Sequence, residues 1–241
     1  MFPFEARIPI DAGLKIDHRL VLETVGPLLT ASRRERIHEV VKNRCFDVAV
    51  VLEGIYDRGN VSAVMRTAEG LGFANFHVIE TQEKFKEANR VTQGADKWVE
   101  ARKWKSTREA VTELKRQGKR LVVTALTDRA KSITDVDFSR PSALVLGNEK
   151  DGVSAEMIEA ADEVVVIPMT GFVQSFNISV AGALSLFQIL RDRELRRGRN
   201  GDLTEEQQAI LAAYYYLRTQ DSAEDVLRQK FGAGGGGTQR A

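Results

Sequence analysis

The sequence is poor in the residues that build disulfides, metal sites and membrane spans. Its 241 residues include one cysteine, Cys45, which excludes an internal disulfide and a cysteine-based zinc site. The three histidines lack the spacing of metal ligands, so we expect no bound metal. There is no run of 18 apolar residues and no charged-then-apolar leader, which argues against a transmembrane helix and against secretion. We therefore expect a cytoplasmic protein without a membrane partner.

Common nucleotide-binding and hydrolase motifs are missing as well. No G-x-G-x-x-G separates the first predicted strand from its helix, and neither G-x-x-x-x-G-K-[ST] nor G-x-S-x-G occurs. Without a glycine-rich turn after that strand, backbone amides cannot close around a phosphate, and without the last pattern there is no nucleophile elbow. These absences argue against the dinucleotide-binding, P-loop and α/β-hydrolase classes.

An excess of one charge sign is also absent, since 35 Lys and Arg nearly balance 34 Asp and Glu. The charges are nevertheless segregated along the chain. Residues 84–120 hold twelve basic against five acidic residues, and residues 191–199 hold five arginines against two acids. Such segregation is typical of a basic face that binds a polyanion, and solvated helix faces are the alternative.

Five short runs rich in Val, Ile and Leu predict buried strands, over residues 48–52, 76–79, 120–124, 143–146 and 164–167. Amphipathic segments predict helices over residues 60–70, 106–117, from 154 onward and over 176–195. Continuous apolar strands alternating with helices indicate an α/β fold, with a parallel sheet and helices on both faces. Ligands of such sheets bind beyond the carboxyl ends of the strands.

The segments around this core predict four regions. Residues 1–46 should form an N-terminal helical arm, interrupted near Gly26-Pro27, and residues 47–197 the α/β domain. Residues 198–231 predict a helical C-terminal extension with helices over 203–217 and 222–231. The glycine-rich residues 232–241 predict a disordered tail.

The first of three polar loops precedes the predicted helix of residues 60–70. Asn60 stands where a helix N-cap is expected, and capping alone would account for it. Arg66 follows nearly two turns later, so its long side chain can reach back toward the loop. An arginine beside the apolar stripe of Met65 and Ala68 is unusual on a merely solvated face. Arg66 is therefore a functional candidate.

Polar residues also follow the fourth and fifth predicted strands. Gly147-Asn148-Glu149 would allow a close backbone approach and place a carboxylate beside a pocket, although a plain turn is the alternative. Residues 167–177 are long for a connection in an α/β fold and place Ser175 and Asn177 around a helix start. Capping is the alternative there, but a cap does not need several polar residues.

Together the three loops resemble the motifs of the SPOUT superfamily, in its TrmH family of RNA ribose 2′-O-methyltransferases. Asn60-x5-Arg66 is similar to motif one, Gly147-Asn-Glu149 to motif two, and Ile167-Pro-Met to Asn177-Ile-Ser to motif three. The resemblance extends over residues 48–190. Residues 33–47 are similar to the tRNA branch, whereas Asn148, Phe176 and the leader of residues 2–30 depart from the family pattern.

The resemblance implies a SPOUT fold with a deep trefoil knot at about residues 143–190, which composition alone would not predict. It also implies S-adenosylmethionine as the cofactor, no metal, and a homodimer. The expected reaction is methyl transfer to a ribose 2′-hydroxyl of tRNA, at guanosine 18 of the D-loop. The alternatives are ribosomal RNA, another tRNA position, or a non-catalytic RNA-binding SPOUT protein.

The resemblance also implies roles for individual residues, according to their positions in the sequence. The resemblance implies that the catalytic residues are Arg66, Asn60, Glu149, Ser175 and Asn177. The residues implied to line the cofactor pocket are Leu126, Gly147, Ile167, Met169 and Phe176. Candidate RNA-binding residues are Arg33, Arg34, Arg36, Arg191, Arg193 and Arg196. A guanidinium pKa above about 12 makes an arginine a poor general base. We favour Arg66 as a group that grips a phosphate and stabilises an alkoxide-like oxygen, with the base role as the alternative.

Overall fold

The computed structural model describes residues 2–55, 57–80, 94–148, 150–173 and 175–232. The chain divides into two compact units, which we treat separately. We call residues 44–202 the sheet unit, and residues 2–43 together with 203–232 the helical unit. Glu149 and the predicted tail from residue 233 onward lie outside the described residues.

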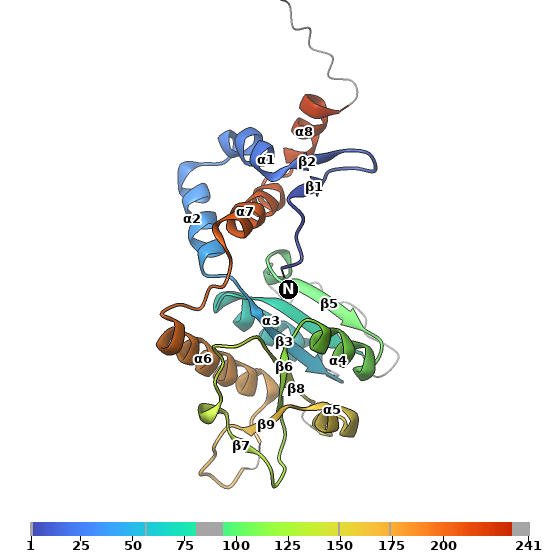
Figure 1. Cartoon of the computed structure of the whole chain (residues 1–241), viewed down its shortest axis with the longest axis vertical. Coiled ribbons are helices and arrows are strands. Elements are labelled where there is room, and N and C mark those ends of the chain that lie inside the picture. Colours follow the sequence, from blue (N-terminus) through green and yellow to red (C-terminus); the bar gives the residue numbers. More distant parts are fainter. Residues whose placement is uncertain (1, 56, 81–93, 149, 174, 233–241) are drawn as a thin grey trace, which may run out of the picture. The chain divides into compact units, whose positions relative to one another are not determined.

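The sheet unit is built on a seven-stranded sheet with the order β5-β4-β3-β8-β6-β9-β7 (Figure 1). Every pair of neighbouring strands is parallel, which confirms the predicted α/β class. The strands are β3 (Cys45–Glu53), β4 (Phe73–Ile79), β5 (Glu100–Trp104), β6 (Arg120–Thr124), β7 (Lys131–Ser132), β8 (Ser142–Leu146) and β9 (Glu163–Val166). The sequence did not predict β5 or β7, which form the two edges and lack a long apolar run.

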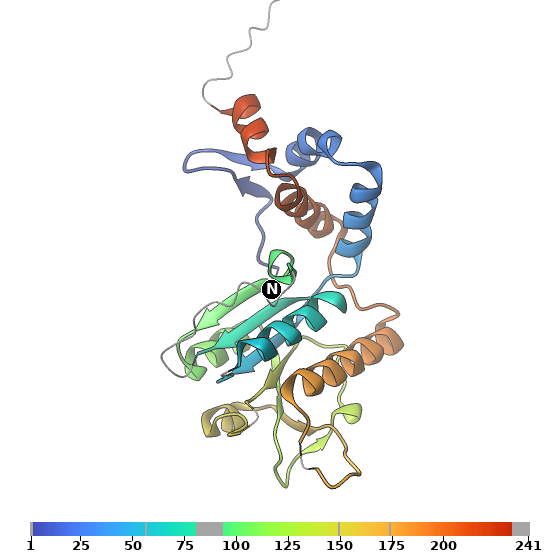
Figure 2. The same cartoon turned by 180° about the vertical axis from the view of Figure 1, so that it is seen from behind.

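Helices cover both faces of this sheet. The helices α4 (Thr107–Arg116) and α5 (Ala155–Ala160) lie on the face toward the viewer in Figure 1. The helices α3 (Arg58–Gly70) and α6 (Ile178–Arg197) cover the opposite face, as Figure 2 shows. The described part of the unit also contains two short 3-10 turns, η2 (Ala95–Lys97) and η3 (Ile133–Asp135).

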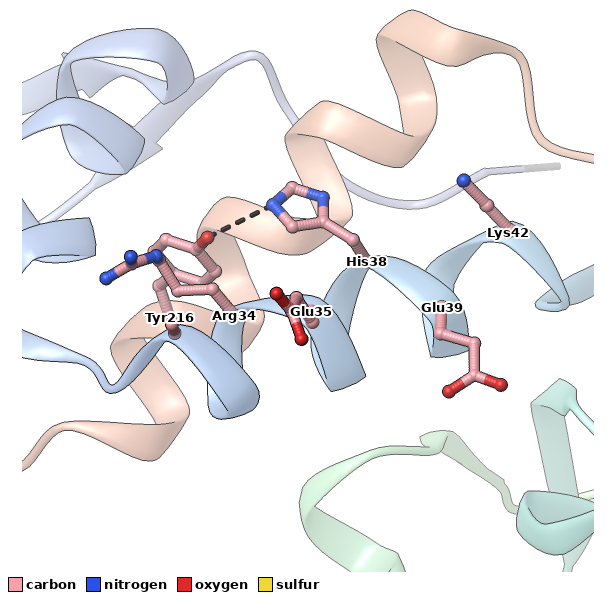
Figure 3. A pocket seen from close by; sticks show the side chains of 7 residues that line it. Arg34, Glu35, His38, Glu39, Lys42 and Tyr216 are labelled. Atoms are coloured by element: carbon pink, nitrogen blue, oxygen red, sulfur yellow. Dashed lines mark hydrogen bonds between the residues drawn. The ribbon is translucent and has the colours of Figure 1, made fainter.

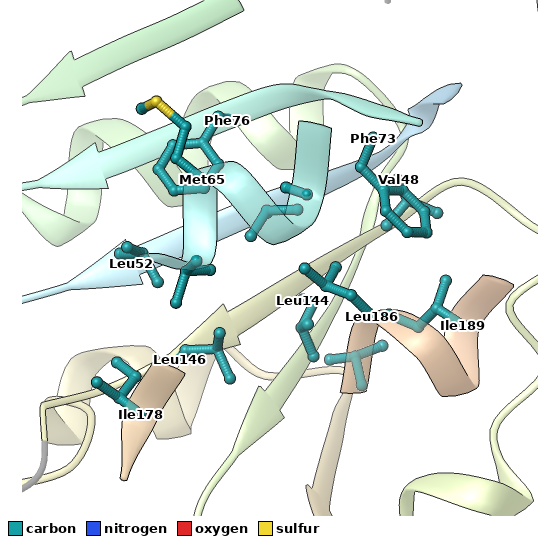
Figure 4. Packing of buried hydrophobic residues seen from close by; sticks show 14 of the residues in the cluster. Val48, Leu52, Met65, Phe73, Phe76, Leu144, Leu146, Ile178, Leu186 and Ile189 are labelled. Carbon is teal, nitrogen blue, oxygen red and sulfur yellow. The ribbon is translucent and has the colours of Figure 1, made fainter. Parts of the chain in front are cut away.

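The core follows the alternation of side chains along each strand. In β3, Val48, Val50 and Leu52 pack with α3 and α6, whereas Ala49 and Val51 belong to the cluster under α4 and α5. Figure 4 shows the first cluster from close by. Because both faces are covered, central strands such as β3 and β8 read as continuous apolar runs. Burying one such Val or Leu side chain contributes about 1.5–3 kcal/mol.

The starts of two helices differ from the sequence prediction. Asp57 caps α3, accepting a hydrogen bond from the Gly59 amide at 2.8 Å, so the predicted N-cap role of Asn60 is wrong. Asn60 is instead the third residue of the helix. The helix expected from residue 176 begins at Ile178, because Asn177 is its N-cap.

The helical unit contains α1 (His18–Val25), η1 (Gly26–Leu28), α2 (Ala31–Lys42), α7 (Glu205–Thr219) and α8 (Ala223–Phe231). Pro27 interrupts the N-terminal helices, as predicted. A hairpin of β1 (Arg7–Pro9) and β2 (Lys15–Asp17) precedes them and was not predicted. Within the described residues, no helix combines the length and apolarity needed to cross a bilayer.

Candidate active site

Four neighbouring strands end at one edge of the sheet. β3, β8, β6 and β9 are adjacent and parallel, so their carboxyl ends lie side by side. The first motif follows β3, the second follows β8 and the third follows β9, while Leu126 lies two residues beyond β6. The topology therefore brings the predicted loops to a common edge.

A close packing contact joins the elements that carry the three motifs. Gly182 in α6 faces Val64 of α3 and Leu146 of β8. A Cβ atom at Gly182 would lie 3.1 Å from Val64 Cγ2 and 3.3 Å from Leu146 Cδ1. Val64 lies two residues before Arg66, and Leu146 directly precedes Gly147. A small residue at position 182 lets α6 approach closely enough to place the third motif beside the other two.

The described residues of the loop after β8, which we call the Gly147 loop (residues 147, 148 and 150–153), pack tightly against one another. A Cβ atom at Gly147 would lie 2.2 Å from the carbonyl carbon of Gly152, so only glycine fits without a shift of the backbone. Asn148 and Gly152 exchange backbone hydrogen bonds of 3.1 Å in both directions. The Asn148 Oδ1 atom also accepts from the amides of Lys150 (2.9 Å) and Asp151 (2.6 Å). Asn148, which departs from the family pattern, therefore has a clear local role in shaping this loop.

The predicted catalytic residues of the first motif lie along α3. Arg66 is exposed, and among the described residues it has no hydrogen-bond or ion-pair partner. Asn60 is half-buried in the first turn of the same helix. A guanidinium that no described residue engages is available to a phosphate or a developing oxyanion.

In the third motif, Ser175 and Asn177 are both exposed. The Asn177 Oδ1 atom accepts from the Ser179 amide at 2.9 Å and from the Ser179 hydroxyl at 2.5 Å. These contacts show that Asn177 caps α6, while its amide nitrogen faces no described acceptor. The remaining predicted residue, Glu149, lies outside the described residues.

The predicted cofactor-lining residues follow β6, β8 and β9. Leu126 is 73% exposed, whereas Gly147, Ile167, Met169 and Phe176 are half-buried. Apolar side chains beside a glycine backbone are the residue types that suit the flat ring of adenosine. Among the described residues, no group of three or more His, Cys, Asp or Glu side chains is placed to hold a metal ion.

The arginines predicted to bind RNA at the end of α6 differ in exposure. Arg193 is fully buried, and its guanidinium donates to the carbonyls of Phe138 and Asn200 and pairs with Asp202 at 3.5 Å. The prediction that Arg193 contacts RNA is therefore corrected, because its charge is used inside the fold. Arg191 and Arg196 are more exposed and pair with Glu194 and Asp192, respectively.

The arginines of α2 also have different local roles. Arg34 donates to the carbonyls of Gly26 (2.9 Å) and Leu29 (2.7 Å) and so closes the turn before α2. Arg33 is exposed, and Arg36 is exposed and pairs with Glu39 at 2.8 Å. Figure 3 shows the open cavity beside α2, about 480 Å³ in volume, where the His38 ring shares a 3.1 Å hydrogen bond with the Tyr216 hydroxyl.

Two acids at the same sheet edge were not among the predicted site residues. Asp57 caps the helix that carries Arg66, and Glu53 lies buried at the end of β3. The sequence contained a signal for Glu53, because this acid directly follows an uninterrupted apolar run. Such a residue must either face solvent or find buried hydrogen-bond donors.

Comparison with known proteins adds to this geometry. A tRNA (guanosine(18)-2′-O)-methyltransferase of Thermus thermophilus is 38% identical over 164 residues, which cover 68% of this chain and 84% of that protein. The crystal structure of the Aquifex aeolicus TrmH/SpoU tRNA modifying enzyme is 34% identical with a TM-score of 0.68, covering 77% of this chain and 95% of that one. An AdoMet-bound rRNA methyltransferase from Sinorhizobium meliloti is 25% identical with a TM-score of 0.56, covering 64% and 59%.

The profile of one protein family matches residues 47–187, more than half of the chain. This range includes most of β3, the three motif loops and the first half of α6. The family agrees with the resemblance carried by the three motifs. The chain belongs to the SpoU rRNA Methylase family.

Proposed function

We propose that the protein transfers a methyl group from S-adenosylmethionine to the ribose 2′-hydroxyl of guanosine 18 in tRNA. The observation that supports this proposal is that the strands before the three motif loops end side by side, with Arg66 exposed on the helix that follows the first loop. The 38% identity to a tRNA (guanosine(18)-2′-O)-methyltransferase supports the choice of substrate.

The residues expected to hold the cofactor are Leu126, Gly147, Ile167, Met169 and Phe176. When bound, S-adenosylmethionine supplies an electrophilic methyl group on its sulfonium. The apolar side chains would cover the adenosine, and the glycine backbone would contact it where a larger residue could not fit. Such positioning is the main contribution that a protein makes to a transfer of this kind.

Arg66 is the proposed catalytic residue. Its guanidinium would bind the phosphate next to the target ribose and stabilise the 2′-oxygen as negative charge develops. Asn60, Glu149, Ser175 and Asn177 would orient Arg66 and the nucleotide. Because Asn177 uses its oxygen to cap α6, its amide nitrogen is the group that would face the substrate.

The connection between β9 and α6 is proposed to form the knot. β9 pairs with β6, whereas α6 packs on Val64 and on Leu146 of β8. Residues 167–177 must therefore cross the carboxyl ends of β6 and β8, which is the path that a threaded connection needs. The knot would hold the Gly147 loop and the third motif together around the cofactor.

A homodimer is proposed through the outer face of α6. Val180, Leu184 and Phe187 are exposed at helical spacing, and Phe172 and Val173 in the preceding loop are exposed as well. An exposed apolar stripe of this kind is typical of an interface. A second copy of the sheet unit would cover the stripe and place the two sites on one assembly.

Basic residues that remain accessible are proposed to contact the tRNA backbone. Arg33 and Arg36 on α2 and Arg191 and Arg196 on α6 are candidates, and Arg193 is not. Contacts of this kind bind by charge and shape and weaken as salt concentration rises.

The test is to incubate the protein with total tRNA and methyl-labelled S-adenosylmethionine and to map the ribose-methylated nucleotide by mass spectrometry. We expect label at guanosine 18, with Arg66→Ala inactive and Arg108→Ala active. Arg108 is an exposed arginine on α4 and serves as a matched control. Label in ribosomal RNA only, at another tRNA position, or nowhere would overturn the proposal.

A further inference from the structure

Glu53, the last residue of β3, places a buried carboxylate at the edge of the sheet that carries the motif loops. Its Oε1 atom accepts from the Thr107 hydroxyl at 2.5 Å and from the Ser154 hydroxyl at 2.8 Å. Its Oε2 atom accepts from the Ser154 amide at 2.9 Å. Thr107 is the first residue of α4, and Ser154 is the N-cap of α5. One carboxylate thus joins a strand to the beginnings of two helices.

Ser154 is also the residue that directly follows the Gly147 loop. At the entry to this loop, Leu146 pairs with Leu52 across the β3–β8 ladder. At its exit, Ser154 is held by Glu53 through both the backbone amide and the hydroxyl. Both ends of the loop are therefore fixed to consecutive residues of the same strand.

The loop has little room to move between its attachments at Leu146 and Ser154. The backbone of Gly147 lies against that of Gly152 and Val153, with contacts that leave no room for a Cβ atom. A shift of Ser154 would consequently be passed to Gly147 through directly packed main chain. Gly147 is the member of this loop that we expect to touch the cofactor.

The chemistry of the anchor favours a role in positioning. Among the described residues no Lys or Arg forms an ion pair with Glu53, so its carboxylate depends on the hydrogen bonds from Thr107 and Ser154. Burying an acid in this way costs desolvation that an apolar residue would not incur. In return, the two oxygens fix the position of Ser154 with directional bonds, which an apolar contact cannot do.

We propose that Glu53 is a positioning residue for cofactor binding, which sets the shape of the Gly147 loop through Ser154. This inference rests on the proposed function, because it takes the Gly147 loop as part of the S-adenosylmethionine site. Glu53 itself makes no contact with the cofactor in this scheme.

The experiment compares four variants of the full chain by calorimetric titration with S-adenosylmethionine and by thermal unfolding. Glu53→Gln offers one acceptor in place of two, and Ser154→Ala removes the hydroxyl bond at the loop exit. Thr107→Val removes the hydroxyl bond to the same carboxylate from the α4 side. Asp202→Asn alters a buried acid at the opposite end of β3, where it accepts from the amides of Phe46 and Asp47.

We expect Glu53→Gln to raise the dissociation constant about 10-fold and Ser154→Ala to raise it about 3-fold, where tenfold corresponds to about 1.4 kcal/mol. Thr107→Val and Asp202→Asn should lower the unfolding temperature but keep the dissociation constant within about 2-fold of wild type, because neither touches the loop. If Glu53→Gln does not fold, the inference is tested by comparing the dissociation constants of Ser154→Ala and Thr107→Val.

Two results among the variants would overturn the inference and leave the proposed function intact. One is unchanged cofactor affinity in both Glu53→Gln and Ser154→Ala. The other is an equal loss of affinity in Thr107→Val or Asp202→Asn, which would reveal a general loss of stability. Failure of the wild-type protein to bind the cofactor would overturn the proposed function, and this inference with it. Binding by the wild type with no difference among the variants overturns this inference alone.

Discussion

The parallel strands of the central sheet begin at one side, which we call the amino edge, and finish at the other, the carboxyl edge. These two sides use polar residues in opposite ways. At the amino edge, Asp202 accepts from the amides of Phe46 and Asp47, and Lys119 donates to the carbonyls of the same two residues at 2.8 Å. Arg44 pairs with Glu69 at 2.6 Å beside them. At this edge charged side chains are buried and engaged with the protein.

At the carboxyl edge, the polar residues of the motifs are turned outward. Ser175 and Asn177 are exposed there, Arg66 is exposed further along α3, and Glu53, a buried acid at this edge, holds a loop rather than a strand end. The same sheet thus has one edge whose polar groups satisfy each other and another whose polar groups are available. A site can be recognised by polar residues that the fold brings together but does not use in its own hydrogen bonds and ion pairs.

The largest effect is expected from Arg66→Ala. If the carboxyl edge is the active site, this change should lower kcat about 1,000-fold, equivalent to about 4 kcal/mol of transition-state stabilisation. The unfolding temperature should not move, because Arg66 is exposed. Single-turnover methylation of tRNA measures the rate, with Arg66→Lys as a second variant. Turnover by Arg66→Lys near that of wild type would show that the planar guanidinium is not required.

Asp202→Ala should do the reverse of Arg66→Ala, since it should lower the stability of the fold and leave the site intact. Removing this carboxylate leaves the buried Arg193 without its charged partner and two backbone amides of β3 without acceptors. We expect a loss of about 3 kcal/mol in the free energy of unfolding, as for other broken buried pairs. Urea denaturation measures it. Cofactor affinity of the folded fraction should stay at the wild-type value, and a parallel loss of affinity would contradict the separation of the two edges.

Gly147→Ala tests the carboxyl edge at the loop that we expect to contact the cofactor. The added Cβ atom would meet backbone atoms 2.2–2.4 Å away, so the Gly147 loop must move. We expect S-adenosylmethionine affinity to fall about 30-fold, or about 2 kcal/mol. Calorimetric titration checks this, with Gly118→Ala as a control outside the site. Gly118 has a positive φ but open space around it, so its replacement should cost stability only.

The smallest effect concerns pH. His77 is fully buried in β4, and desolvation is the main reason that its pKa is lowered to about 3 from an ordinary 6.5. The Trp104 indole donates to its Nδ1 atom at 2.9 Å, so Nε2 carries the proton and donates to Asn75. Below pH 6.5 the unfolded chain binds a proton that the native chain does not, so stability falls as the pH drops toward 3.

When the pH is lowered from 7.5 to 5.5, we expect His77 to reduce the free energy of unfolding by about 1.4 kcal/mol. Urea denaturation followed by tryptophan fluorescence measures the change. His77→Gln keeps hydrogen-bonding groups and removes the titration, so its stability should depend less on pH across this interval. An identical pH dependence in wild type and variant would contradict the assignment.

The sequence predicted the sheet well where burial leaves a clear pattern. Residues 120–124 match β6 directly, and the residues predicted for β3 and β8 lie within those strands, because strands covered on both faces are continuously apolar. The edge strand β5 alternates half-buried and exposed positions and includes Arg102 and Lys103, so it gave no such signal. The β1–β2 hairpin was missed because its strands are three residues long.

The site was harder to predict, because residue type does not disclose burial. Arg193 and Arg196 lie in the same basic run, yet one guanidinium is buried and the other half-exposed. The position of Asn60 suggested a cap, but Asp57, three residues after Gly54, caps the helix instead. The contacts of Glu53 depend on Thr107 and Ser154, which are 54 and 101 residues away in the chain. Local patterns carry no information on such pairs.

The measurement that tests the account most directly is amide hydrogen exchange with and without S-adenosylmethionine. If the carboxyl edge is the cofactor site, binding should slow exchange in residues 145–154 and 165–178. Residues 44–47 and 198–202 at the amino edge should not change. Protection confined to the amino edge, or to the helical unit, would contradict the assignment of the site.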